Sequence, residues 1–185
     1  MKKNVGLYLC MLLFAFAIAC GGVILNAGLK EKNRTTQASQ TSGSNRTLRL
    51  SDVPVLMDEG YTGILYIGFP SCPYCKEVKP IVYGIKEEYN CNFKYIKLRD
   101  KNNNKLFSDK DKKNVYKYFS EYMDKNNDGT YTIYAPLVVV VKKGKVIDAH
   151  LSTVDGHDAH IASMTEEQKE EFITIIRTLF DEVSK

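Results

Sequence analysis

The sequence predicts an α/β fold, a sandwich in which helices flank a central mixed β-sheet. After a short N-terminal helix, the hydrophobic patterns from residue 63 onward follow the order strand, helix, strand, helix, hairpin and helix. That alternation is typical of a layered α/β domain. The hairpin near the C-terminal end indicates that the sheet is mixed rather than wholly parallel.

The folded part begins with a short helix and a buried strand. Ser51 or Asp52 can cap the helix, which carries Pro54 in its first turn, where proline is well tolerated. Residues 63–69 form a nearly unbroken apolar run that contains two glycines. Such a run is typical of a strand buried on both faces.

Three longer helices are predicted by apolar residues that recur every three or four positions. The first follows Cys75, and the second spans residues 109–123. The third begins after a capping box formed by Thr165 and Gln168. Its apolar face consists of six residues: Phe172, Ile173, Ile176, Leu179, Phe180 and Val183.

The remaining strands have different patterns. Residues 92–98 alternate aromatic or aliphatic side chains with lysines, which indicates a second strand. Residues 137–141 are a β-branched run, and Lys143-Gly144 turns the chain into residues 145–148 to complete a hairpin.

A membrane segment is predicted at the N-terminus. Residues 4–29 contain no charged residue, and Lys2 and Lys3 precede them. About 20 apolar residues cross a bilayer as a helix, whereas a cleaved signal peptide has an apolar core of about 7–15. We therefore expect residues 1–29 to include an N-terminal transmembrane helix with the lysine end in the cytoplasm and the C-terminal domain extracytoplasmic.

Two other outcomes for this segment stay open. Residues 16–21 resemble a lipobox, in which small Ala19 precedes a cysteine, Cys20, that would be lipidated after cleavage. Residues 22–25 continue apolar, which is unlike most lipoproteins. Conventional cleavage after Ala19 or Ala27 would instead release a secreted protein.

Residues 30–47 are rich in Thr, Ser, Gln and Asn and predict a flexible linker. Residues 48–185 form the folded domain. The net charge of +4 comes from Lys2, Lys3 and the cations of the linker, and the folded domain is close to neutral. This distribution predicts no nucleic-acid partner.

The motif that carries chemistry is Cys72-Pro73-Tyr74-Cys75, at the junction of a strand and a helix. A helix N-terminus stabilises an anion, so a thiolate there has a lowered pKa and is the reactive form. Pro73 suits the first helical position because its missing N–H would have no partner. Cys72, nearer the end of the helix, would attack a disulfide, and Cys75 would resolve the mixed disulfide.

Two other roles for this pair are less consistent with the sequence. A zinc site needs further ligands, and the sequence contains no second CxxC motif. A purely structural Cys72–Cys75 disulfide would close too short a loop to gain much chain entropy. We therefore expect no metal and no organic cofactor.

The domain resembles the thioredoxin superfamily. The resemblance rests on the dithiol after a strand, on Pro80 five residues beyond it, and on Ala135-Pro136 directly before an apolar strand. It covers residues 48–185. It implies a thioredoxin-like fold, a redox disulfide between Cys72 and Cys75, and a cis proline at Pro136 that faces the dithiol.

More narrowly, residues 66–75 resemble the bacteriocin transport accessory proteins of Gram-positive bacteria. There are also departures from thioredoxin. Ser71 stands where thioredoxin has a tryptophan, and Tyr66 stands where it buries an acid that assists proton transfer. Residues 101–133 contain an insertion of about twenty residues relative to that family.

Other constellations are interpreted as structural. Residues 124–130 reproduce half of a calcium loop, but Ala135 stands where the closing glutamate is required, so a polar turn is expected. His157 and His160 are expected in a solvated loop rather than at a metal. Cys91 is expected to be a buried or inert thiol.

The sequence thus predicts a membrane-tethered thiol–disulfide oxidoreductase of exported proteins or peptides. Ala135 and Pro136, with Pro73 and Tyr74, would form the substrate-binding surface, and a redox partner would reset the dithiol. The alternative is a non-catalytic thioredoxin-like accessory protein for bacteriocin export or maturation. The predicted chemistry is the reduction, formation or exchange of disulfides through this dithiol.

Overall fold

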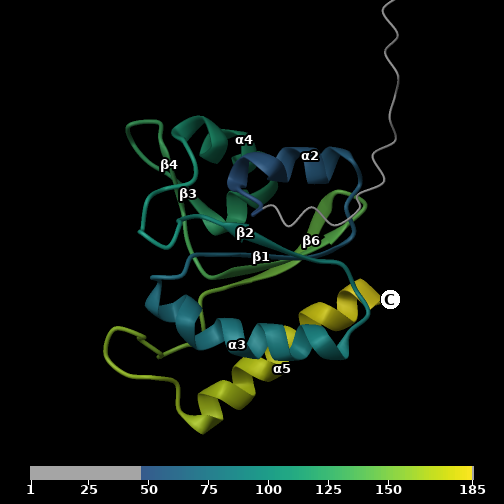
Figure 1. The fold of residues 1–185 in the computed structure, drawn as a ribbon, viewed down its shortest axis with the longest axis vertical. Helices are drawn as coiled ribbons and strands as arrows, with labels where there is room; N and C mark the ends of the chain where they lie inside the picture. The colour runs from purple at the N-terminus through teal and green to yellow at the C-terminus, as the bar shows by residue number, and fades with distance from the viewer. Residues whose placement is uncertain (1–46, 185) are drawn as a thin grey trace, which may run out of the picture. The chain divides into compact units, whose positions relative to one another are not determined.

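The computed structural model describes residues 47–184. Its centre is a four-stranded mixed sheet in which β1 is parallel to β2 and antiparallel to β5, and β5 is antiparallel to β6 (Figure 1). The strands follow the order β2-β1-β5-β6 and have these bounds: β1 Gly63–Gly68, β2 Phe93–Lys97, β5 Leu137–Lys142 and β6 Lys145–Leu151. The predicted mixed sheet is confirmed.

Helices cover both faces of this sheet (Figure 1). One face packs against α3 (Pro73–Glu88) and α5 (Glu166–Ser184). The other packs against α2 (Val53–Asp58) and α4 (Asp109–Phe119), and two short 3-10 helices flank these: η1 Leu50–Asp52 and η2 Ser120–Tyr122. The predicted sandwich of helices around a sheet is therefore the observed architecture.

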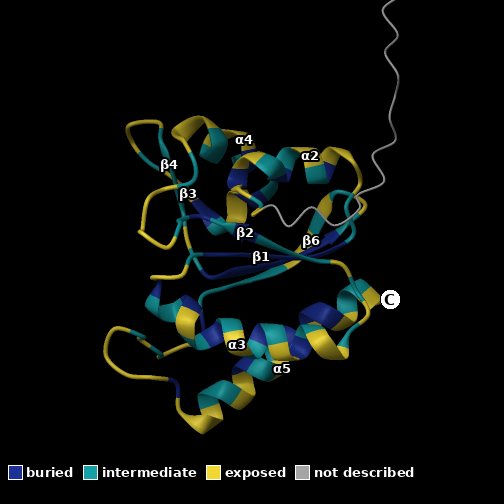
Figure 2. Cartoon of the chain, viewed as in Figure 1, coloured by how far each residue is buried: buried dark blue, intermediate teal, exposed yellow. Residues whose placement is uncertain are grey.

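Strand β1 is buried on both faces because its side chains alternate between two apolar cores. Ile64 and Tyr66 pack with α3 and α5, whereas Leu65 and Ile67 pack with α2 and α4. Figure 2 shows this burial in the middle of the sheet, with exposed residues on the outer sides of the helices. The double burial explains why the run lacks polar alternation.

The register of β1 determines what lies near its C-terminal end. Ile67 pairs with Ile96 of β2 on one side and with Leu137 of β5 on the other. The chain therefore leaves β1 beside the start of β5, where Ala135 and Pro136 precede the strand. Helix α3 begins at this same end of the sheet.

The helix expected over residues 109–123 is shorter than predicted. It ends at Phe119, and after η2 the chain enters a small hairpin of β3 (Met123–Lys125) and β4 (Tyr131–Ile133). The connecting residues 126–130 form a polar turn, as expected. Residues 47–184 contain no cluster of three or more His, Cys, Asp or Glu side chains that could hold a metal ion.

The capping box predicted before α5 is present. The Thr165 backbone N–H donates to Oε1 of Gln168 at 2.9 Å, and the Gln168 N–H donates to Oγ1 of Thr165 at 3.2 Å. The predicted apolar face of the helix points into the core, with its most buried residues being Phe172, Ile176, Leu179 and Phe180.

The predicted transmembrane segment (residues 4–29) lies outside the described residues, as does nearly all of the predicted linker at residues 30–47. Within residues 47–184, none of the helices has the length and apolar character needed to span a bilayer.

Candidate active site

The dithiol lies where the chain passes from β1 into α3. Cys72 is the N-cap residue of α3, with extended backbone angles, and Pro73 occupies the first turn as predicted. The Lys76 N–H donates to the Cys72 carbonyl at 3.1 Å and closes that turn. The sulfur of Cys72 therefore lies at the helix N-terminus, where unpaired N–H groups and the helix dipole favour a negative charge.

The two cysteines contact each other directly. The backbone N–H of Cys75 donates to Sγ of Cys72 at 3.2 Å, as a capping interaction. Both cysteines are free thiols, and each is only 3% exposed. Because water contributes little to stabilising a thiolate in such a buried site, protein hydrogen bonds have to supply that stabilisation.

The surroundings shift the pKa values of the two thiols in opposite directions. Hydrogen bonding from the Cys75 thiol lowers the pKa of Cys72 to about 7, with further help from backbone N–H groups and Lys76, although burial opposes the shift. The pKa of Cys75 is raised, first by its hydrogen bond to Cys72 and then by burial. Near neutral pH the pair thus offers one thiolate, at Cys72, and retains a proton on Cys75.

Ala135 lies beside the dithiol. When protonated, the Cys72 thiol donates to the Ala135 carbonyl at 3.6 Å, although 63 positions separate the two residues. The peptide bond between Ala135 and Pro136 is cis. The structure thus brings together Cys72, Cys75 and Ala135, which the sequence analysis assigned to one site.

Tyr74 holds a loop that the sequence did not connect to the site. Its hydroxyl donates to Oδ1 of Asp158 at 2.9 Å, and its ring packs edge-on against the rings of His157 and His160. The loop connects β6 to α5. His157 and His160, expected in a solvated loop, are in a loop that packs against Tyr74, one of the two residues between the cysteines.

Internal hydrogen bonds order this loop. One ring nitrogen of His157 bonds with Oγ1 of Thr153 at 2.9 Å, and the other bonds with the Ala162 carbonyl at 3.1 Å. The pKa of the Asp158 carboxyl is lowered by the backbone N–H of His160 and then by the Tyr74 hydroxyl. The hydrogen-bonding capacity of the His157 ring is therefore used within the loop.

Cys91 differs from the dithiol. It is partly exposed and lies before β2, where it packs against the core formed by α3 and α5. Burial raises the pKa of its thiol. The thiol expected to be buried or inert is thus partly exposed, and little of it is ionised at neutral pH.

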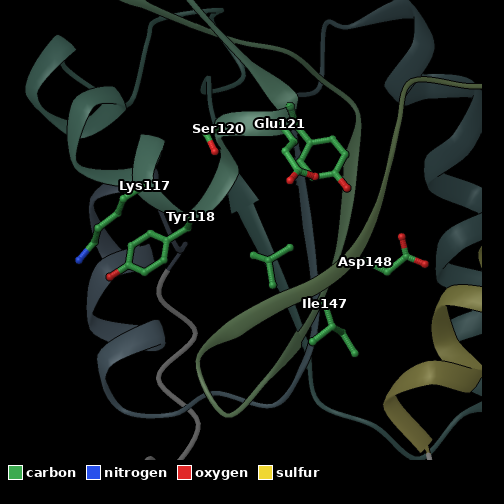
Figure 3. A pocket seen from close by; sticks show the side chains of 8 residues that line it. Lys117, Tyr118, Ser120, Glu121, Ile147 and Asp148 are labelled. Atoms are coloured by element: carbon green, nitrogen blue, oxygen red, sulfur yellow. The ribbon is translucent and has the colours of Figure 1, made fainter.

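A separate pocket of about 300 Å³ lies between the end of α4, η2 and β6 (Figure 3). Figure 3 shows that polar side chains contribute much of its lining, including Lys117, Glu121 and Asp148. No residue of the dithiol site lines it. Part of its wall comes from residues 117–122, within the segment in which an insertion is predicted, and the pocket is distinct from the candidate active site.

The fold and the site together have the arrangement expected of a thioredoxin-like fold: a mixed sheet between helices, with a CxxC dithiol capping the helix after the first strand. No protein-family model and no curated protein matches the sequence. Among solved structures, the reduced thioredoxin pre-protein of Schistosoma mansoni is similar at 12% identity and a TM-score of 0.35, over 69% of this chain and 94% of that one. The features of this fold in the chain are its strand order and the position of Cys72 at the N-cap of α3.

Proposed function

We propose that the protein is a thiol–disulfide oxidoreductase whose redox centre is the Cys72–Cys75 pair. The observation that carries this proposal is the capping of α3 by the Cys72 sulfur, with its pKa lowered to about 7 beside a protonated Cys75. A thiol whose pKa is near the ambient pH is the most effective attacking group in disulfide exchange.

The exchange proceeds in two balanced steps. The Cys72 thiolate attacks one sulfur of a substrate disulfide, so that a mixed disulfide forms and the other substrate sulfur leaves as a thiolate. Cys75 then loses its proton and attacks Sγ of Cys72, which forms the Cys72–Cys75 disulfide and releases the second substrate thiolate. The substrate gains two electrons and the dithiol loses two. In the reverse direction the same centre oxidises a substrate dithiol, and another redox protein resets it.

The substrate-binding surface is proposed at Ala135 and Pro136, with Pro73 and Tyr74. The Ala135 carbonyl reaches the attacking sulfur, so an extended chain lying along this segment would bring its own disulfide to Cys72. Backbone pairing of this kind tolerates many sequences, because it relies on main-chain hydrogen bonds.

The cellular setting is also a proposal. The uncharged residues 4–29 support a membrane-tethered protein with its domain outside the cytoplasm. The resemblance of residues 66–75 to bacteriocin transport accessory proteins supports exported proteins or peptides as substrates. An accessory role without catalysis is the alternative, and it requires no thiol chemistry at Cys72.

The test uses the full-length Cys75→Ser variant with oxidised glutathione as the probe. We expect a stable mixed disulfide to accumulate at Cys72, because the serine hydroxyl that replaces the resolving thiol cannot attack it. Mass spectrometry of the digested protein locates the adduct. In the wild-type protein the same treatment should give the Cys72–Cys75 disulfide instead.

Two matched variants complete this test. Cys72→Ser should acquire little adduct, since the pKa of Cys75 is raised, and Cys91→Ser should behave as the wild type. Equal labelling of Cys72→Ser and Cys75→Ser would contradict the assignment of Cys72 as nucleophile. No adduct in either variant would contradict the proposed function.

A further inference from the structure

One buried polar group in the core next to the dithiol has no structural explanation. Tyr66 is fully buried in β1, and its hydroxyl oxygen has no hydrogen-bond partner within residues 47–184. It is the one buried side-chain nitrogen or oxygen atom of those residues in that condition. An unpaired hydroxyl in an apolar core costs stability, so its retention calls for a role.

The Tyr66 ring and the Cys75 sulfur both lie next to Gly68, on the side where another residue would carry its Cβ atom. A Cβ atom at Gly68 would lie 3.0 Å from Sγ of Cys75 and 3.3 Å from Cε1 and Cζ of Tyr66. Cζ carries the hydroxyl group, so the hydroxyl end of the ring and the sulfur border the space that glycine leaves open. The absence of a side chain at this position thus permits both groups to approach one another.

We propose that the Tyr66 hydroxyl is a hydrogen-bond donor to the thiolate of Cys75 during resolution of the mixed disulfide. In the reduced protein Cys75 holds its proton and Tyr66 is unpaired. When Cys75 ionises, its sulfur becomes a strong hydrogen-bond acceptor, and the unpaired Tyr66 hydroxyl can donate to it. The role in resolution rests on the proposed function, but the contact between Tyr66 and Cys75 can be measured without any disulfide exchange.

Tyr66 acts as a donor and keeps its proton throughout. Its pKa is raised, first by burial and then by neighbouring Cys75, so it cannot serve as a base at neutral pH. The proton of Cys75 passes to the departing substrate thiolate or to water. A hydrogen bond from Tyr66 to the Cys75 thiolate acts to lower the pKa of Cys75, against the larger effects of Cys72 and burial, which raise it.

The other ionisable groups around Tyr66 come from the N-cap of α3, from α3 itself and from β2. Cys72 contacts Cys75 and acts on Tyr66 electrostatically, Tyr83 packs edge-on at 6.3 Å between ring centroids, and Tyr95 packs at 5.3 Å. The Lys79 ammonium lies over the rings of Tyr83 and Tyr95, at 5.2 and 5.1 Å from their centroids. The side chains that α5 contributes to this core are apolar.

The experiment measures the pH profile of Cys75 alkylation in full-length protein carrying Cys72→Ser, which removes the coupling between the two thiols. Iodoacetamide labelling is quantified at Cys75 by peptide mass spectrometry. Adding Tyr66→Phe should shift the profile upward by about one pH unit, which is about tenfold slower labelling at a fixed pH below the midpoint. Tyr83→Phe is the matched control and should leave the profile unchanged.

A merely structural role for Tyr66 predicts a different result. In that case Tyr66→Phe would change the unfolding transition and leave the Cys75 profile in place, and this outcome would overturn the proposal. If Tyr66→Phe does not fold, the NMR signal of the Tyr66 Cζ carbon in the Cys72→Ser protein decides. It should shift with the midpoint of Cys75 alkylation, and a constant signal would equally overturn the proposal. Glutathione capture by Cys75→Ser tests the oxidoreductase role separately.

Discussion

Replacement of Cys72 by alanine is expected to abolish disulfide exchange, reducing the rate with oxidised glutathione to that of the probe and buffer alone. With a pKa of about 7, Cys72 is about half thiolate at neutral pH. The pKa values of Cys75 and Cys91 are both raised above the ordinary value. An ordinary thiol with a pKa near 8.5 is only about 3% thiolate at pH 7, so neither residue can replace Cys72.

The rate of disulfide exchange by the wild-type protein should also depend on pH through the ionisation of Cys72. The thiolate fraction of Cys72 rises as the pH increases, so the initial rate of mixed-disulfide formation should climb through a midpoint near 7. Stopped-flow measurement of thiol loss follows the rate, with Cys91→Ala as the control that should match the wild type. A Cys72→Ala protein that retained half of the wild-type rate would show that another thiol attacks.

The largest expected loss of stability follows from Gly144→Ala. Lys143 and Gly144 connect β5 to β6 with φ values of 49° and 73°, as a two-residue turn of this twist requires. A Cβ atom at Gly144 would lie 2.0 Å from the Met57 carbonyl oxygen, at the end of α2. The left-handed backbone conformation costs an alanine about 1–2 kcal/mol, and the clash with the Met57 carbonyl adds to this strain. We therefore expect the free energy of unfolding to fall by more than about 4 kcal/mol.

Gly129→Ala provides a matched comparison. Gly129 has a similar φ of 80°, but nothing lies within 4 Å of the added Cβ atom. Its substitution should cost only the strain, about 1–2 kcal/mol. Urea unfolding followed by circular dichroism measures both free energies. Equal losses in the two variants would show that the contact between the hairpin turn and α2 does not restrict the turn.

The centre of the site could be predicted from the sequence because its signals are local. An apolar strand pattern ends just before Cys72, and a helical pattern begins just after Cys75, so the dithiol had to lie at a helix N-terminus. Ala135-Pro136 stands directly before a β-branched run. Side-chain periodicity and motif spacing were sufficient for these features.

The surroundings of the dithiol could not be predicted, because they depend on contacts between distant residues. Tyr74 and Asp158 are 84 positions apart, and no pattern near Asp158 shows that its loop packs on the CxxC motif. Strand alternation assigns Tyr66 to one face of the sheet but does not show that its hydroxyl is unpaired near Cys75.

The early end of α4 has a similar cause. Tyr122 continues the helical spacing of Val115, Tyr118 and Phe119, so periodicity alone extends the helix too far. In the structure the chain leaves the helix after Phe119, and Met123 begins a strand that pairs with β4. Pairing between strands separated by a turn overrides the local helical preference.

The most direct measurement is the reduction potential of the Cys72–Cys75 pair in the full-length protein. The protein is equilibrated with glutathione or dithiothreitol redox buffers, trapped by alkylation, and analysed by peptide mass spectrometry. We expect a single two-electron transition confined to these two cysteines, at a potential between about −120 and −270 mV, the range of redox-active members of this fold. A pair that forms no disulfide, or one reduced only below about −300 mV as a structural disulfide is, would contradict a redox-active dithiol.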